Sequence, residues 1–136
     1  MSLMVLKLVL VLLTLAGNSA RISRSCMNCI GKVEGGGRFC NGDMASPSCG
    51  LYQIKKKYWK DCDTGFSWRL TSAINFQARR CISSYMKRYE GRCAKALGKK
   101  TSSLTCDDYG RLHNGGPNGC SARSTLTYLK AMRKKC

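Results

Sequence analysis

The chain has 136 residues, of which 24 are Lys or Arg and 7 are Asp or Glu, so its formal net charge is +17. This length fits one modest domain. The charge favours anionic partners (bacterial envelope polymers, anionic lipid, glycosaminoglycans or nucleic acid) without choosing among them, and a merely solvated basic surface is the alternative.

The first 20 residues have the pattern of a secretory signal peptide. Lys7 precedes the apolar run Leu8–Leu15, and small residues follow up to Ala20. This run is too short to span a bilayer, and no later stretch is apolar enough to do so. We therefore expect a secreted, extracellular protein with a signal peptide over residues 1–20, one domain over residues 21–136 and no transmembrane segment.

All ten cysteines lie in residues 21–136. An even number of cysteines in a small exported domain predicts five disulfides, whose pairing the spacing leaves open. A zinc site at Cys26-x-x-Cys29 is the competing interpretation, but it is disfavoured by an oxidising compartment and by the presence of a single histidine. No metal and no cofactor are expected.

The N-terminal half predicts one helix followed by a small β region. Ser25 can cap a helix over 26–33, with Glu34 at its end and the glycine run 35–37 to stop it. Residues 38–58 resemble a hairpin region, with a turn dipeptide at Asn41-Gly42 and a strand at 51–54.

The C-terminal half predicts further helices. Residues 67–82 have helical spacing, and 81–89 continue the pattern. A helix capped by Ser102-Ser103 extends through Leu112, and a last helix covers 122–132. An apolar stripe marks the first of these helices, formed by Leu70, Ala73, Ile74, Ala78 and Cys81. The fold class is therefore α+β, a small disulfide-rich domain that is mostly helical with a small β-hairpin element.

Two carboxylates stand out because acidic residues are so scarce. Glu34 and Asp43 each lie in a stretch otherwise held by cysteines. A structural role remains open for both: Glu34 can pair with Lys32 or Arg38, and Asp43 can form a turn after Asn41-Gly42.

Several motifs, in this order and spacing, carry a family resemblance: C-x-x-C-I-x-x-x-E at 26–34, D-M-A-S-P-S-C-G-L-Y-Q-I-K at 43–55, K-Y-W-K-D-C at 57–62, Y-M-K-R-Y at 85–89 and H-N-G-G-P-N-G-C at 113–120. The chain resembles the invertebrate-type lysozymes, the family that includes destabilase. It departs from the family pattern by lacking four cysteines, expected near Gly31, Gly36 or Gly37, 70–71 and 76–77.

The resemblance implies a lysozyme-like domain that hydrolyses the β-1,4 bond between N-acetylmuramic acid and N-acetylglucosamine in peptidoglycan, in antibacterial defence or digestion. Glu34 would be the general acid and Asp43 the nucleophile of a retaining mechanism, which needs two carboxyl groups in unlike environments. Substrate-binding residues would be Ser46, Ser48, Tyr52, Gln53, Lys55 and His113. The implied disulfides are Cys26–Cys106, Cys29–Cys136, Cys40–Cys49, Cys62–Cys81 and Cys93–Cys120.

The expected partners are peptidoglycan and anionic envelope polymers, with no specific nucleic acid, and the protein would be a monomer or weak homodimer. Two other functions remain open. One is a cationic, non-enzymatic antimicrobial or envelope-binding protein. The other is a γ-glutamyl-lysine isopeptidase that uses Ser48 and His113, as ascribed to some relatives.

Overall fold

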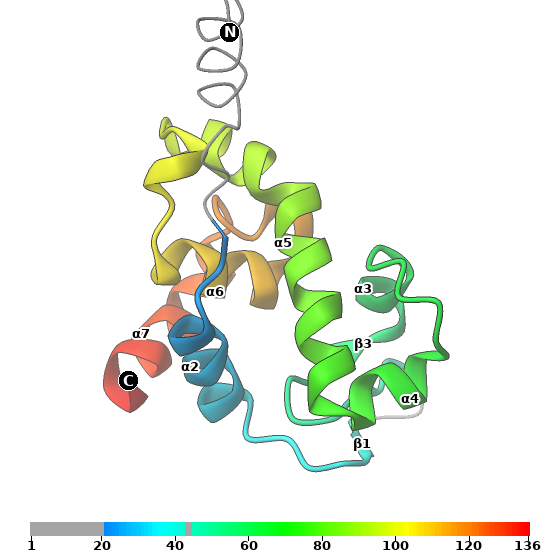
Figure 1. The fold of residues 1–136 in the computed structure, drawn as a ribbon. Coiled ribbons are helices and arrows are strands. Elements are labelled where there is room, and N and C mark those ends of the chain that lie inside the picture. The colour runs from blue at the N-terminus through cyan, green and yellow to red at the C-terminus, as the bar shows by residue number, and fades with distance from the viewer. Residues whose placement is uncertain (1–20, 43–44) are drawn as a thin grey trace, which may run out of the picture.

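The computed structural model describes residues 21–42 and 45–136. A small sheet lies with α3 and α4 on one side of the longest helix, α5, and α2, α6 and α7 lie on the other side (Figure 1). The elements are α2 (Arg24–Glu34), β1 (Cys40–Asn41), β2 (Ser48–Cys49), β3 (Ile54–Lys55), α3 (Lys56–Lys60), α4 (Trp68–Ala73), α5 (Asn75–Leu97), η1 (Thr101–Ser103), α6 (Cys106–Gly115), η2 (Gly116–Asn118), η3 (Arg123–Thr125) and α7 (Leu126–Lys135). The α+β fold class is confirmed.

Helix α2 begins and ends with clear capping signals. The hydroxyl of Ser23, and not that of Ser25 as expected, accepts a hydrogen bond from the Cys26 N–H at 3.1 Å. Gly35 closes the helix in the left-handed region with φ 59°, a conformation that glycine adopts without steric cost. This cap makes Glu34 the last residue of the helix.

The sheet consists of three very short antiparallel strands in the order β1-β2-β3. Its register pairs Cys40 with Cys49 and Cys49 with Ile54. The strand expected at 51–54 is wrong for its first three residues, which belong to a turn that begins at Gly50 (φ 74°) and ends at Gln53 (φ 49°). These positive φ values are incompatible with an extended strand.

The helix expected over 67–82 is two helices. Ile74 is extended (φ −99°, ψ 110°) between α4 and α5. The stripe of apolar residues is therefore broken: Ala78 and Cys81 are buried, whereas Leu70 and Ile74 are each 44% exposed. The interruption lies where Gly50 packs against the backbone of Ser72, so closely that a Cβ at Gly50 would collide with the Ser72 carbonyl.

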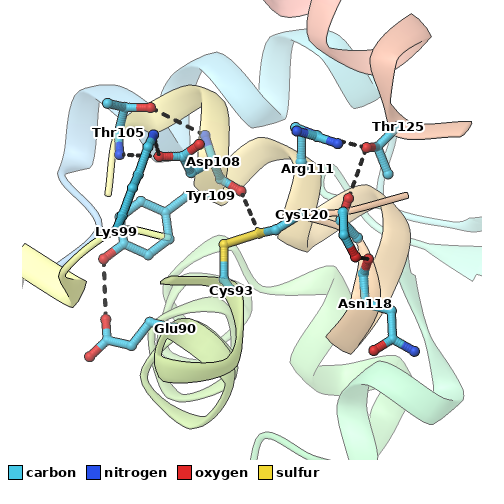
Figure 2. Close-up of a disulfide and its surroundings, with 12 residues drawn as sticks. Glu90, Cys93, Lys99, Thr105, Asp108, Tyr109, Arg111, Asn118, Cys120 and Thr125 are labelled. Carbon is cyan, nitrogen blue, oxygen red and sulfur yellow. Dashed lines mark hydrogen bonds and ion pairs between the residues drawn. A yellow bond between two sulfur atoms is a disulfide. The ribbon is translucent and has the colours of Figure 1, made fainter. Parts of the chain in front are cut away.

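Helix α6 is capped by Thr105, not by the expected Ser102-Ser103 pair, which lies in η1. The Thr105 hydroxyl accepts from the Asp108 N–H, and the Asp108 carboxylate accepts from the Thr105 N–H at 2.9 Å, a complete capping box. Lys99 donates to the same carboxylate at 2.7 Å, as Figure 2 shows. The last helix follows a short 3₁₀ turn and begins at Leu126, four residues later than expected.

Disulfides join these elements around one core. The pairs are the five that the resemblance implies: Cys26–Cys106, Cys29–Cys136, Cys40–Cys49, Cys62–Cys81 and Cys93–Cys120. Cys26 and Cys29 thus belong to different disulfides, which rules out the zinc interpretation of that motif. The largest fully buried side chains include those of Tyr52, Ile30, Ile82 and Leu112.

Across residues 21–42 and 45–136, no helix has the length and apolarity needed to cross a membrane.

Candidate active site

A pocket of about 480 Å³ lies where the ends of α2 and α6 meet α3, α5 and the strands β2 and β3. Its volume falls in the range typical of small-molecule sites. The described residues that line it come from segments far apart in the sequence: Glu34, Ser48, Gln53, Lys55, Lys57, Tyr58, Asp61, Tyr85, His113, Asn114, Gly115, Gly116 and Pro117.

Glu34 reaches this pocket from the last position of α2. Its side chain is 17% exposed, and its Oε1 lies 3.4 Å from Nε2 of His113. This is the only contact within 4.0 Å between Glu34 and a basic side chain of the described residues, so the alternative of a pair with Lys32 or Arg38 is not what the structure contains. The carboxyl group is largely shielded from water yet open to a ligand.

His113, near the end of α6, is held by hydrogen bonds at both ring nitrogens. Nε2 donates to the Tyr52 carbonyl at 3.0 Å, and Nδ1 lies 3.1 Å from the Tyr58 hydroxyl. A carbonyl can only accept, so Nε2 carries a proton. Burial, followed by the nearby Tyr85, Tyr128 and Glu34, raises the pKa of Tyr58. The Tyr58 hydroxyl therefore stays protonated and can donate to Nδ1.

Three tyrosines form a poorly hydrated wall beside Glu34. Tyr58 and Tyr85 stack with ring centroids 3.6 Å apart. Burial raises the pKa of Tyr85 and also that of Tyr128, whose pKa the charge of Glu34 raises further. The Tyr128 hydroxyl is buried, and a weak hydrogen bond to the Glu34 carboxyl group adds to the rise in its pKa. It is thus a protonated phenol close to the carboxyl group.

The other side of the pocket is polar and charged. Asp61 accepts a hydrogen bond from the Tyr89 hydroxyl at 2.8 Å, and Lys55 and Lys57 line the same pocket. Burial and this hydrogen bond raise the pKa of Tyr89, so its hydroxyl remains the donor. A ligand in the pocket meets both a carboxylate and two ammonium groups.

The structure brings together four of the residues that the resemblance implies for substrate binding: Ser48, Gln53, Lys55 and His113 line the pocket. Ser46 is exposed and accepts from Lys55 Nζ at 3.4 Å. The Tyr52 side chain is fully buried in the core instead of lining the pocket, because its hydroxyl accepts a hydrogen bond from Arg79.

Asp43, the expected nucleophile, lies outside the described residues. Its distance from Glu34 therefore stays a prediction of roughly 5–5.5 Å between the carboxyl groups, the separation of a retaining glycosidase.

Sequence reasoning did not assign Lys57, Asp61, Tyr85 or the segment 114–117 to the site. The signal was present, since all of them belong to the motifs K-Y-W-K-D-C, Y-M-K-R-Y and H-N-G-G-P-N-G-C. Tyr58 packs in the core and also lines the pocket.

The chemistry of this pocket is that of acids, bases and hydrogen bonds. Within residues 21–42 and 45–136, no group of three or more His, Cys, Asp or Glu side chains is placed to hold a metal ion. Glu34, next to the Nε2–H group of His113 and a wall of phenols, can give a proton to a ligand atom and be stabilised as a carboxylate afterwards.

The chain is similar to known proteins in both sequence and structure. The family model named Destabilase matches residues 23–136. The chain is 44% identical to a lysozyme of Ostrea edulis, with 96% of this chain and 93% of that protein covered. It is 39% identical to an invertebrate-type lysozyme of Ruditapes philippinarum, with 83% and 81% covered. Meretrix lusoria lysozyme, solved in complex with Aeromonas hydrophila PliI, has a similar structure (TM-score 0.70, 42% identity, 83% and 89% covered).

Proposed function

Since this chain belongs to the destabilase family of invertebrate-type lysozymes, we propose that Glu34 and Asp43 perform its reaction by a retaining mechanism. The protein is a muramidase, a glycoside hydrolase that cleaves the β-1,4 bond between N-acetylmuramic acid and N-acetylglucosamine.

The observation that carries the proposal is the position of Glu34, 17% exposed in the pocket and 3.4 Å from Nε2 of His113. In the first step the Glu34 carboxyl group gives its proton to the glycosidic oxygen, while the Asp43 carboxylate attacks the anomeric carbon and the C–O bond breaks. In the second step Glu34 takes a proton from water, which attacks the same carbon and releases Asp43.

His113 acts here as a positioning residue. Its Nε2–H, already bonded to the Tyr52 carbonyl, faces the carboxylate that Glu34 becomes after proton transfer. Because Nδ1 is occupied by Tyr58, the ring keeps this orientation. The stabilisation is of the preorganised kind, present before charge develops.

Clearing of a Gram-positive cell-wall suspension tests these roles. We expect Glu34→Gln and Asp43→Asn to lower the rate by orders of magnitude. Asp63→Asn is the matched control, since it removes the same charge at an exposed residue outside the pocket. Equal clearing by the wild type and both variants would refute the assignment, and the cationic, non-enzymatic function would replace it.

An isopeptidase activity is the second candidate, because Ser48 and His113 line the same pocket. The geometry favours it less: both ring nitrogens of His113 already have partners, and no hydrogen bond joins it to Ser48 among the described residues. A γ-glutamyl-lysine substrate separates the two activities. Cleavage that is lost in Ser48→Ala and kept in Glu34→Gln would establish the isopeptidase as a distinct activity.

We also propose that residues 1–20, which the structure does not describe, are a signal peptide that directs residues 21–136 to the extracellular space. Five disulfides in the described domain fit an oxidising compartment. N-terminal sequencing of the exported protein tests the boundary, and finding the full chain in the cytosol would contradict it.

A further inference from the structure

Two adjoining hollows lie on the opposite side of α5 from the pocket that contains Glu34. They measure about 670 Å³ and 290 Å³ and share the residues Ile22, Ser83 and Ser84, so they form one continuous groove. Residues of the segment before α2, of the first turn of α2 and of α5 line it. We call it the α5 groove.

Cations dominate the α5 groove. Arg24, Arg79 and Arg80 line its larger part, and Arg21 and Lys87 line the smaller part. The groove contains one carboxylate, Glu90, but this residue is only 8% exposed and accepts a hydrogen bond from the Tyr109 hydroxyl at 3.1 Å. The pocket with Glu34, in contrast, mixes two carboxylates with its two lysines.

The groove follows one face of the helix. Phe76, Arg80, Ser83 and Lys87 are spaced i, i+4, i+7 and i+11, which places them in one stripe along α5. At a rise of 1.5 Å per residue the stripe is about 16 Å long. Tyr85, which lines the pocket, points to the other side of the same helix. The α5 groove is thus long enough for several units of a linear polymer.

Part of the groove is preorganised for an anion. Arg79 donates through Nε to the Tyr52 hydroxyl at 2.9 Å and through Nη2 to Asn28 Oδ1 at 2.8 Å, which fixes its guanidinium plane. A guanidinium group presents donors that match the oxygens of a phosphate. The exposed hydroxyls of Ser83 and Ser84, which bond to no side chain that the structure describes, add further donors.

We propose that the α5 groove binds a linear phosphodiester polymer, of the kind attached to bacterial cell walls, separately from the catalytic pocket. The choice of this polymer rests on the proposed muramidase function, whereas the preference for phosphate rests on the charges. A membrane surface fits less well: the cations line a groove instead of surrounding a protruding apolar patch, and only one large apolar side chain of the groove, Phe76 (67% exposed), extends into solvent.

The test measures binding of a synthetic poly(glycerol phosphate) chain at several salt concentrations, with Glu34→Gln present in every protein so that hydrolysis plays no part. The variant Arg80→Gln/Lys87→Gln removes two exposed groove cations. Its matched control, Arg92→Gln/Lys95→Gln, removes one Arg and one Lys from exposed positions of the same helix that line neither hollow.

We expect the groove variant to bind roughly tenfold more weakly, with a shallower dependence of affinity on salt, because each lost phosphate contact lowers the number of counterions released. The control should lose less than about threefold. The same deficit should appear on intact walls and disappear on walls stripped of phosphodiester polymers.

Equal losses in the groove variant and the control would overturn the proposal, since binding would then follow net charge alone. Binding to phosphatidylglycerol vesicles but not to the polymer would also overturn it, in favour of a membrane surface. Neither result depends on hydrolysis, so a failure of the catalytic assignment is recognised separately in the wall-clearing assay.

Discussion

The substitution Asp108→Asn tests how strongly one buried carboxylate stabilises the helix that carries His113. The Asp108 side chain is 8% exposed and accepts from Lys99 at 2.7 Å and from the Thr105 N–H at 2.9 Å. Asparagine keeps the shape but loses the charge, and charge-assisted hydrogen bonds are about twice as strong as neutral ones. We expect each of the two hydrogen bonds to weaken by about 1 kcal/mol. The contribution of the Lys99 bond is reduced because Lys99 is 37% exposed, so the free energy of unfolding should fall by about 1.5 kcal/mol in total.

The stability that Asp108 contributes depends on pH. Burial alone would raise the pKa of Asp108, but hydrogen bonds from Lys99 and Thr105 outweigh it and hold that pKa below its ordinary value. The folded state therefore binds this proton less readily than the unfolded chain. The contribution to stability is complete above the ordinary carboxyl pKa of about 4 and is lost as the pH falls through the folded value.

Urea unfolding at pH 7, pH 5 and pH 2 measures this, with the disulfides intact. The difference between wild type and Asp108→Asn should be about 1.5 kcal/mol at the two higher pH values and should nearly vanish at pH 2. Asp107→Asn is the control, because its ion pair with Arg133 is exposed and should contribute less than about 0.5 kcal/mol. A difference as large at pH 2 as at pH 7 would show that the charge of Asp108 is not the cause.

Two further substitutions probe the surroundings of Glu34. Gly36→Ala should lower wall-clearing activity several-fold, because a Cβ at this position would collide with the Gly50 carbonyl and displace the segment after Glu34. Gly37→Ala is the control, since a Cβ at Gly37 would meet no atom within 4 Å. Equal activities of the two variants would refute this reasoning. Tyr128→Phe should lower kcat by roughly tenfold, less than the loss of a fully preorganised donor. Its free energy of unfolding should change by less than about 1 kcal/mol, because the hydroxyl makes only a weak hydrogen bond, to Glu34. An unchanged kcat would exclude a role for this phenol.

Local signals in the sequence predicted most helices but not their ends. Both Ser23 and Ser25 are residue types that can cap a helix. In the structure Ser23 is the cap, and the residue before it, Ile22, is buried in the core. Nothing in residues 67–82 breaks a helix. The break at Ile74 accompanies a tertiary contact, the approach of Gly50 to the end of α4, which periodicity cannot reveal.

The candidate site could be predicted only in part for a related reason. Glu34 could be singled out because it ends a helix in a chain with few acids. Asp61 and Tyr85 carry no local sign of their role, since they reach the pocket only once α3 and α5 pack beside the ends of α2 and α6. Tyr52 shows the opposite case: it lies next to residues that line the pocket, but the turn at Gly50–Gln53 directs its side chain into the core.

The arrangement of the disulfides has a consequence for resistance to proteolysis. Cys26–Cys106 and Cys29–Cys136 span most of the domain, and Cys93–Cys120 overlaps both. A protease that cuts one peptide bond anywhere between Cys26 and Cys136 therefore leaves two fragments that are still covalently joined. A nicked molecule would migrate as a single band until it is reduced, and it could keep the ends of α2 and α6 together after its backbone has been cut.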